Sequence, residues 1–295
     1  MDESILLTGA TGLVGRATID RLIRTRRVFA TVRDIPKIPL PADAKTILHD
    51  LRDRQDPQIP ESISTVVHLA QSSSYRDFPR HALDVFEVNV GAAQRLLDWA
   101  HRQGVARFIY ASSGGVYRSG EGPFKEDGEA AEPAVLDHYA ASKRCGEFIA
   151  AAYSNEMTIV ILRFFFVYGP RQRDTMLMPR LIGRVMRGEA ITLDGECGVR
   201  MNPVYVDDAA DAVVAAVKLN SSETINVAGP EVASIRDIGT MIGEATFRVA
   251  RFNKVCECEP RHMVGDTEKM SQLLVAPRIG IAEGLRRVVA ARSDA

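Results

Sequence analysis

Short apolar runs recur along the first part of the chain, and stretches with helical spacing separate them. The runs are nearly continuous and rich in β-branched residues, which is typical of strands buried on both faces of a parallel sheet. They cover residues 5–7, 28–32, 46–48, 65–70, 107–111 and 158–164. Helical patterns lie between them at about 13–23, 80–103 and 139–155. This alternation predicts an α/β fold built on a doubly wound parallel sheet with right-handed crossovers.

The pattern changes beyond Gly169-Pro170. An amphipathic helix near 178–187 is followed by a strand at 204–206 and a helix at 207–218. A strand at 224–227, a helix capped from Ser234 and a last helix near 281–292 complete the chain. We expect a dinucleotide-binding domain at 1–169 and 203–230. A smaller, interwoven substrate-binding region at 170–202 and 231–295 would lie over the carboxyl ends of the strands, where open α/β sheets bind ligands.

A glycine-rich turn joins the first strand to the first helix. Its sequence is Thr8-Gly9-Ala10-Thr11-Gly12-Leu13-Val14-Gly15. A dinucleotide-binding turn needs one glycine for the bend, one for approach to the pyrophosphate and one for helix–strand packing. Gly9, Gly12 and Gly15 can supply these roles, although their GxxGxxG spacing is a weak signal by itself.

The ends of the next strands carry residues suited to the rest of a dinucleotide. Arg33 follows the second strand and is itself followed by Asp34. An arginine at this place suits a 2′-phosphate and an acidic residue suits a free ribose, so the sequence favours NADP and leaves NAD open. By position, Asp50-Leu51 is expected to meet the adenine, and Leu69-Ala70 to line the pyrophosphate channel.

Candidate chemistry lies in Tyr139-Ala140-Ala141-Ser142-Lys143, which places a phenol and an ammonium on one helix face. A free tyrosine is too weak a base at neutral pH, but an adjacent cation favours the phenolate. Lowering its pKa by about 3 units requires about 4 kcal/mol, which Lys143 and a nicotinamide charge could supply together. Ser113 ends the fifth strand, where its hydroxyl can donate to the substrate oxygen that Tyr139 protonates or deprotonates.

Motifs along nearly the whole chain, in this order, resemble the extended short-chain dehydrogenase/reductases of the NAD-dependent epimerase/dehydratase group, a Rossmann-type family. They are TGATGLVG, VVHLA, Asn89-Val90, SSGGVY, YAASK, RFFFVYGPRQ and NPVYVDD. The resemblance implies that Tyr139 is the catalytic acid/base, that Lys143 orients the nicotinamide ribose and that Ser113 polarises the reacting carbonyl. It also implies cofactor contacts at Leu13, Val14, Arg33, Asp50, Leu51, Leu69, Ala70, Asn89 and Phe165, together with the turn residues Gly9, Thr11, Gly12 and Gly15. For Asn89, helix packing is an equal alternative.

Departures from the family pattern bear on the substrate. Gly114-Gly115 stands where 4,6-dehydratases place an acidic pair, which disfavours that reaction. Phe166 replaces an asparagine that contacts the diphosphate in many sugar-nucleotide members. Residues expected to meet a sugar-nucleotide substrate are Ser113, Gly114, Phe166, Arg171, Arg200 and Arg261.

Two classes of function follow from these residues. The first is an enzyme that transfers hydride at a secondary alcohol or ketone, most simply a sugar-nucleotide 4-epimerase or 4-ketoreductase. An NADPH-dependent ketoreductase of a non-nucleotide small molecule is the alternative within this class. The second class is a non-catalytic NAD(P)-binding regulator, against which the intact set of Ser113, Tyr139 and Lys143 argues.

Composition narrows the partners. Among 295 residues the formal net charge is −1, and no basic run interleaves with aromatics, so nucleic acid is an unexpected partner. No run of about 18 apolar residues and no leader-like segment occurs, so we expect a cytoplasmic protein that does not enter membranes. Four scattered cysteines and isolated histidines lack zinc spacing, which predicts free thiols and no metal.

The helices at about 80–103 and 139–155 predict assembly. The first carries more apolar residues than one stripe packed on a sheet requires, including Ala93 and Leu97, and the second, which includes Phe148, has residues on one side small enough for a neighbouring helix to approach closely. The family resemblance suggests that they pair with their symmetry mates in a two-fold homodimer. Cover of the extra apolar surface by the chain's own loops is the alternative.

Overall fold

The computed structural model describes residues 3–117, 122–128, 136–256, 260 and 262–293. The chain divides into two compact units. Unit 1 comprises Met1–Arg118, Glu129–Arg163 and Ala210–Ile225, and unit 2 comprises Ser119–Gly128, Phe164–Ala209 and Asn226–Ala295. Each unit is described by itself.

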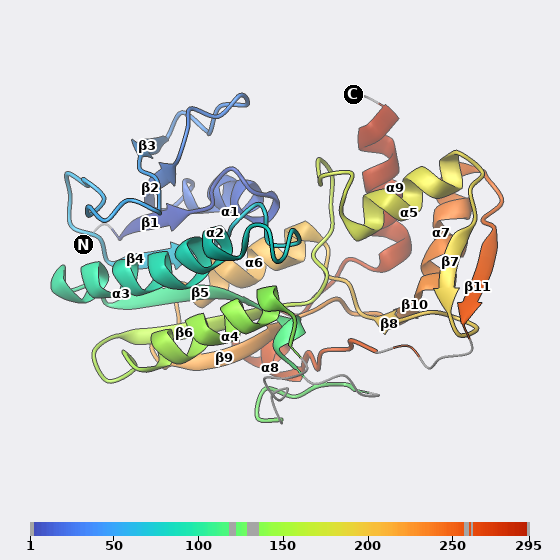
Figure 1. Ribbon diagram of the computed structural model, residues 1–295. Helices are drawn as coiled ribbons and strands as arrows, with labels where there is room; N and C mark the ends of the chain where they lie inside the picture. Colours follow the sequence, from blue (N-terminus) through green and yellow to red (C-terminus); the bar gives the residue numbers. More distant parts are fainter. Residues whose placement is uncertain (1–2, 118–121, 129–135, 257–259, 261, 294–295) are drawn as a thin grey trace. The chain divides into compact units, whose positions relative to one another are not determined.

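A seven-stranded sheet forms the centre of the fold (Figure 1). Its strands, in the order β3-β2-β1-β4-β5-β6-β9, are Ala44–Leu48, Arg27–Val32, Ser4–Thr8, Thr65–His68, Arg107–Ser113, Thr158–Phe164 and Glu223–Val227. The pairs from β3 to β5 are parallel. The order reverses direction between β1 and β4, which is the switch point where doubly wound sheets bind ligands. The predicted doubly wound α/β fold is confirmed.

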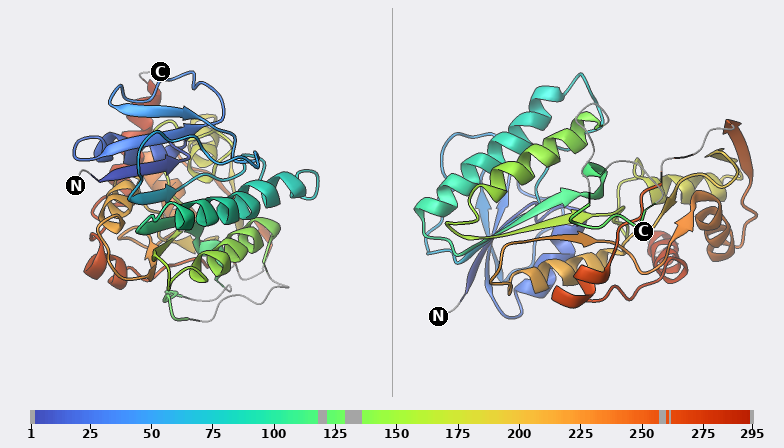
Figure 2. Two further views of the ribbon diagram at one scale, coloured as in Figure 1. Left: turned by 90° about the vertical axis from the view of Figure 1, so that its left-hand side faces the viewer. Right: turned by 90° about the horizontal axis from the view of Figure 1, so that it is seen from below.

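Helices cover both faces of this sheet. Figure 2 shows α3 (Ala92–Arg102) beside α4 (His138–Ala151) on one face and α1 (Leu13–Leu22) with α6 (Val206–Ala216) on the other. Between the sheet and the α3–α4 layer lies a core that includes Phe29, Leu97, Trp99 and Phe108, all at most 5% exposed. On the opposite face, Arg21 Nε lies 2.6 Å from Asp211 Oδ1 and links α1 to α6.

The helix predicted at 80–103 contains a wider turn. Its parts are α2 (Ala82–Phe86), a π-helical segment η1 (Glu87–Gly91) and α3. Such segments insert an extra residue into a turn and are frequent at functional sites. Here the segment contains Asn89, one of the predicted cofactor residues.

Unit 2 holds short strands and four helices among its described residues. Parallel β7 (Ile191–Asp194) and β11 (Phe252–Cys256) form one pair, and antiparallel β8 (Arg200–Met201) and β10 (Ala233–Ser234) form the other. Helix α7 (Ile235–Thr246) packs against α5 (Leu177–Met186) and α9 (Ile281–Ser293), and α8 is Glu268–Leu273. Ser234 caps α7 in a reciprocal capping box with Asp237, as the Ser234 signal predicted.

Two local expectations are wrong. The strand predicted at 204–206 is only an isolated bridge between Tyr205 and Tyr168, because α6 already begins at Val206. Cys256 is disulfide-bonded rather than a free thiol, whereas Cys145 and Cys197 are free. Among the described helices, none has the length and apolar character needed to span a membrane.

Candidate functional site

The glycine turn has the geometry of a phosphate cradle. Gly9 has a φ of +74°, and a β-carbon there would lie 2.6 Å from the amide nitrogen of Ala70. A β-carbon on Gly15 would lie 2.1 Å from the Gly9 carbonyl oxygen, so helix α1 can pack on the turn only with glycine at this position. Gly12 is the N-cap residue of α1, and no side chain caps the helix there. Gly12 and Thr11 are both exposed. The free N-terminus of α1 therefore fits the pyrophosphate of a dinucleotide.

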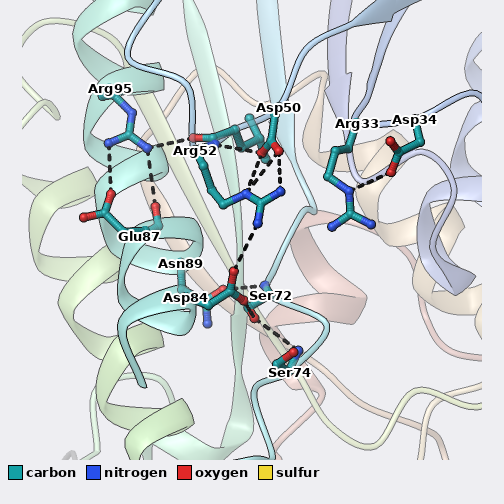
Figure 3. A network of polar contacts seen from close by, with 11 residues as sticks. Arg33, Asp34, Asp50, Arg52, Ser72, Ser74, Asp84, Glu87, Asn89 and Arg95 are labelled. Carbon is teal, nitrogen blue, oxygen red and sulfur yellow. Dashed lines mark hydrogen bonds and ion pairs between the residues drawn. The ribbon is translucent and has the colours of Figure 1, made fainter. Parts of the chain in front are cut away.

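The ends of β2 and β3 carry the residues predicted for the adenosine half (Figure 3). Arg33 Nε donates to Asp34 Oδ2 over 2.8 Å, and the two side chains are 60% and 76% exposed. The Asp50 carboxylate accepts from Arg52, which holds the pKa of Asp50 below its usual value. Leu51 is held through its carbonyl oxygen, which accepts from Arg95 on α3 over 2.7 Å.

The end of β4 is tied to the glycine turn. Ala70 N donates to Thr8 Oγ1 over 3.3 Å, and Leu69 N donates to the Thr8 carbonyl over 3.3 Å. His68 Nδ1 lies 2.7 Å from the same hydroxyl. Burial and the nearby Lys143 charge lower the pKa of His68 to about 3, so this imidazole is neutral. Sequence reasoning missed His68, because its environment is formed by three strands.

Asn89 joins the loop after β4 to helix α4. Its Oδ1 accepts from Ser72 N and its Nδ2 donates to Ser142 Oγ, both over 2.9 Å, and the residue is 1% exposed. Figure 3 shows Asn89 directed from the helix toward Ser72. Ser142 Oγ in turn donates to the Tyr139 carbonyl over 2.7 Å. These contacts support a packing role for Asn89 between the loop and α4. Its direct contact with a cofactor stays a prediction.

The three predicted catalytic residues lie on two adjoining elements. Ser113 ends β5 and caps a short 3₁₀ turn, η2 (Gly114–Val116), by accepting from Gly115 N over 3.1 Å. Tyr139 and Lys143 lie one turn apart on α4, which Asp137 caps by accepting from Ala140 N over 2.7 Å. Lys143 Nζ lies 5.9 Å from the centre of the Tyr139 ring.

Lys143 is buried, 2% exposed, and its Nζ donates to the Ala111 carbonyl over 2.9 Å. Burial lowers the pKa of Lys143 to about 7, although the Glu147 charge opposes this shift. The amine is therefore close to half protonated at neutral pH. The bond to Ala111 anchors this amine at a fixed point beside the Tyr139 ring.

The protein's own groups do not give Tyr139 the low pKa that the sequence analysis expected. Burial and the neighbouring Tyr75 phenol raise the pKa of Tyr139, while a hydrogen bond from Ser113 lowers it. Burial lowers the pKa of Lys143 to about 7, which reduces the average positive charge beside the phenol at neutral pH. Stabilisation of the phenolate must therefore come from groups that move toward Tyr139 or bind beside it.

A buried ionic network fixes α4 against β5 and β6. Arg163 forms two 2.9 Å bonds to the Glu147 carboxylate, and it also donates to Tyr117 Oη over 2.7 Å. Ser112 and Arg144 complete the carboxylate's partners. Burial raises the pKa of Glu147, but the hydrogen bonds and charge of Arg163 outweigh burial and hold this pKa below its usual value. The carboxylate therefore stays charged. Because a broken buried pair typically costs about 3–5 kcal/mol, this network holds α4 firmly.

Sequence reasoning also missed Gln71. The Tyr139 hydroxyl donates to Gln71 Oε1 over 3.0 Å, and the Tyr75 ring centre lies 4.6 Å from the Tyr139 ring centre. Both residues belong to the loop after β4. The only sequence signal was their place at the carboxyl end of a central strand, because the loop has no periodicity.

The remaining predicted residues belong to unit 2. Phe165 is buried, and its N–H donates to the Val227 carbonyl over 2.9 Å. Phe166 and Arg171 have φ values of +43° and +63°, in the left-handed region that side chains disfavour. Arg200 lies on β8, whereas Arg261 lies outside the described residues.

Phe166 lines a cavity of about 270 Å³ within unit 2. The lining is mainly apolar, with Arg180, Arg184 and Thr192 among its residues. A mainly apolar cavity with a few polar groups is the usual form of a small-molecule site. Its other lining residues are Leu177, Leu181, Ile191, Val199, Met201 and Ile235.

Comparisons with known proteins agree with this geometry. A model of the family described as NAD dependent epimerase/dehydratase matches residues 5–228. The chain is 28% identical to the uncharacterized UDP-glucose epimerase YtcB of Bacillus subtilis, over 97% of this chain and 96% of that one. It is 31% identical to a dTDP-glucose 4,6-dehydratase of Streptomyces griseus, over 82% and 75%. A crystal structure of UDP-glucuronic acid 4-epimerase from Bacillus cereus, with UDP-glucuronic acid and NAD, superposes with a TM-score of 0.85, 27% identity and 99% coverage of both chains.

Proposed function

This chain belongs to the NAD dependent epimerase/dehydratase family, and from that premise we propose that it is a sugar-nucleotide 4-epimerase. One observation carries the proposal: Ser113, Tyr139 and Lys143 lie together on β5 and α4, and Gly114-Gly115 follows Ser113. The set supplies a hydroxyl donor, a phenol and an amine for proton transfer at a sugar alcohol. It supplies no acidic pair after Ser113 for the loss of water.

The residues present fit a dinucleotide. The Gly9–Gly15 turn and the start of α1 would hold the pyrophosphate, and Asp50 and Leu51 the adenine. The bound dinucleotide supplies the acceptor and donor of hydride. Tyr139 takes the proton of the substrate hydroxyl and returns it, Ser113 donates to the same oxygen, and Lys143 is predicted to contact the nicotinamide ribose.

For the substrate, we propose that the cavity of unit 2 receives the nucleotide base. Its apolar wall includes Phe166, and Arg180 and Arg184 offer donors beside it. Arg171, Arg200 and Arg261 remain predicted diphosphate contacts. Relatives whose names specify UDP-sugars support this substrate class. We also propose the predicted division, in which 1–169 and 203–230 bind the dinucleotide and 170–202 and 231–295 bind the substrate, although Phe166 of the first part lines the substrate cavity.

Cofactor choice depends on Arg33. Its exposed guanidinium supports NADP, because it can bind a 2′-phosphate. Asp34 bonded to it and Asp50 nearby oppose a phosphate, and the B. cereus structure contains NAD. The expectation of NADP stays a prediction, which the ratio of kcat/KM for the two dinucleotides would measure.

We also propose a homodimer through the outer faces of α2 and α4. Leu83, Phe86 and Phe148 are 81%, 51% and 62% exposed there. Ala93 and Leu97, in contrast, are fully buried in the core of unit 1, so substitutions at these two positions would not report on an interface. Light scattering on Phe148→Glu would test the dimer, and a mass near that of one chain in the wild type would contradict it.

The deciding experiment identifies the nucleotide released by denaturing the purified protein and then follows the interconversion of UDP-glucose and UDP-glucuronic acid with their 4-epimers. Tightly held NAD and turnover without added cofactor would support the epimerase. Exchangeable NADPH that is consumed would indicate a reductase instead, and loss of water from a dTDP- or UDP-hexose would indicate a dehydratase. Binding without turnover of any such substrate would favour the regulator.

A further inference from the structure

The loop between β4 and α2, residues 69–81, is held in place near its start. Ser72 N donates to Asn89 Oδ1 over 2.9 Å, and Ser72 Oγ bonds the Asp84 carboxylate. Ser74 N donates to Ser72 Oγ over 3.1 Å. Figure 3 shows this cluster at the start of the loop, linked through Asp84 to Arg52. The main chain next to Gln71 is therefore fixed.

Aromatic contacts fix the same loop to the start of α4. The Tyr75 ring lies against the Tyr139 ring, with centroids 4.6 Å apart, and the Phe78 ring stacks on His138 at 4.9 Å. Gln71 itself is exposed, so its terminal carboxamide can rotate while its backbone stays in place. Among the described residues, its carboxamide oxygen accepts from the Tyr139 hydroxyl over 3.0 Å.

We propose that Gln71 is a positioning residue for proton transfer at Tyr139, with a carboxamide that accepts from the phenol and, turned over, donates to the phenolate. The inference rests on the proposed function, because an epimerase needs Tyr139 in both protonation states during one turnover. When the phenolate takes the proton of the substrate hydroxyl, that O–H bond breaks and the phenol O–H bond forms. Gln71 gains and loses no proton in this step.

The chemistry of the side chain explains why glutamine suits this position. Its carbonyl oxygen and its amino group are nearly equal in size, so a half-turn of the amide exchanges an acceptor for a donor. A glutamate of the same length could only accept, and a leucine could do neither. A hydrogen bond to an ion is roughly twice as strong as one between neutral groups, so the donating orientation favours the phenolate more than the accepting orientation favours the phenol.

Other side chains around the phenol bring charge or a hydroxyl. Tyr75 and Arg76 face it from the loop, Asp137 and Lys143 from α4, and Ser113 from β5. Burial and Tyr75 raise the pKa of Tyr139, whereas Ser113 and Arg76 lower it. Gln71 is the carboxamide bonded to the hydroxyl, and it therefore responds to the protonation state without titrating.

The test compares Gln71→Leu and Gln71→Glu with the wild type. The ionisation of Tyr139 is followed by near-ultraviolet difference absorbance in protein saturated with NAD⁺, with Tyr139→Phe as the blank for the other tyrosines. We expect Gln71→Leu to raise the pKa of Tyr139 by about one unit, and Gln71→Glu to raise it further through charge repulsion. In both variants the pH profile of kcat should move to higher pH, because the pKa of Tyr139 rises, while KM should stay nearly unchanged.

A matched control is present in the chain. Gln94 Nε2 donates to Tyr153 Oη over 2.9 Å on the exposed side of α3, and Gln94→Leu should leave both the titration and the profile unchanged. If Gln71→Leu lowers the pKa of Tyr139 or leaves it unmoved, the amide only accepts and the proposal is wrong. The absorbance titration needs no turnover, so a protein that lacks epimerase activity but shows the shift would overturn the proposed function alone.

Discussion

Phe166 and Phe247 are two phenylalanines with left-handed backbone, and their side chains differ in burial. Their φ values are +43° and +53°, and Phe247 forms the C-cap of α7. Left-handed backbone costs a residue with a β-carbon about 1–2 kcal/mol, whereas asparagine tolerates it. The side chains differ, because Phe166 is 37% exposed and lines the cavity while Phe247 is 96% exposed. Substituting each by asparagine therefore separates strain from burial.

The magnitudes decide the sign at each position. Phe247→Asn relieves strain and gives up almost no buried surface, so the free energy of unfolding should rise by about 1 kcal/mol. Phe166→Asn relieves similar strain but loses roughly two-thirds of the burial of a phenylalanine, about 1–2 kcal/mol. Its stability should therefore fall by up to about 1 kcal/mol.

Urea unfolding of both variants and equilibrium binding of UDP provide the assay. Phe166→Asn should weaken UDP binding, because strain that persists at a cavity wall is expected to serve ligand contact. Phe247→Asn should bind UDP like the wild type. The reasoning is refuted if Phe247→Asn is destabilised, or if both variants bind UDP equally well.

Three further predictions concern the catalytic and cofactor residues. Tyr139→Phe should abolish turnover while dinucleotide binding survives, because the ring still packs on Tyr75; activity within a few-fold of the wild type would remove Tyr139 from the mechanism. Lys143→Met should weaken dinucleotide binding and stabilise the fold at pH 7. Since the pKa of Lys143 falls from 10.5 to about 7 on folding, the unfolded chain binds the proton more readily, and wild-type stability should rise between these pH values. The advantage of the methionine variant, at most about 5 kcal/mol, should shrink over that range in unfolding titrations, and a pH-independent difference would contradict the buried-amine argument. Arg33→Asp should shift the kcat/KM ratio from NADP toward NAD, and a wild type that already prefers NAD would show that Arg33 does not bind phosphate.

The sequence by itself determined the parts of this protein that local patterns encode. Apolar runs and helical spacing located the strands and the main helices, because burial on a sheet imposes a short period on the chain. Gly9 and Gly15 were identifiable from their spacing in a turn between a strand and a helix, and in the structure no β-carbon fits at either position. Tyr139 and Lys143 were singled out because four residues make one helical turn, Ser113 lies at a strand end, and the surrounding motifs resemble the family.

Tertiary structure decided the environment of those residues. Gln71 reaches Tyr139 across 68 positions, and the loop that carries it has no periodic pattern to predict its path. Burial next to Ala111 sets the pKa of Lys143, so a helix pattern could place its ammonium near the phenol without fixing its charge. The left-handed backbone of Phe166 likewise follows from the chain around it, because phenylalanine has no local preference for that conformation. The spacing of residues along one helix or strand can be read from the sequence, whereas desolvation and contacts between elements exist only once the chain has folded.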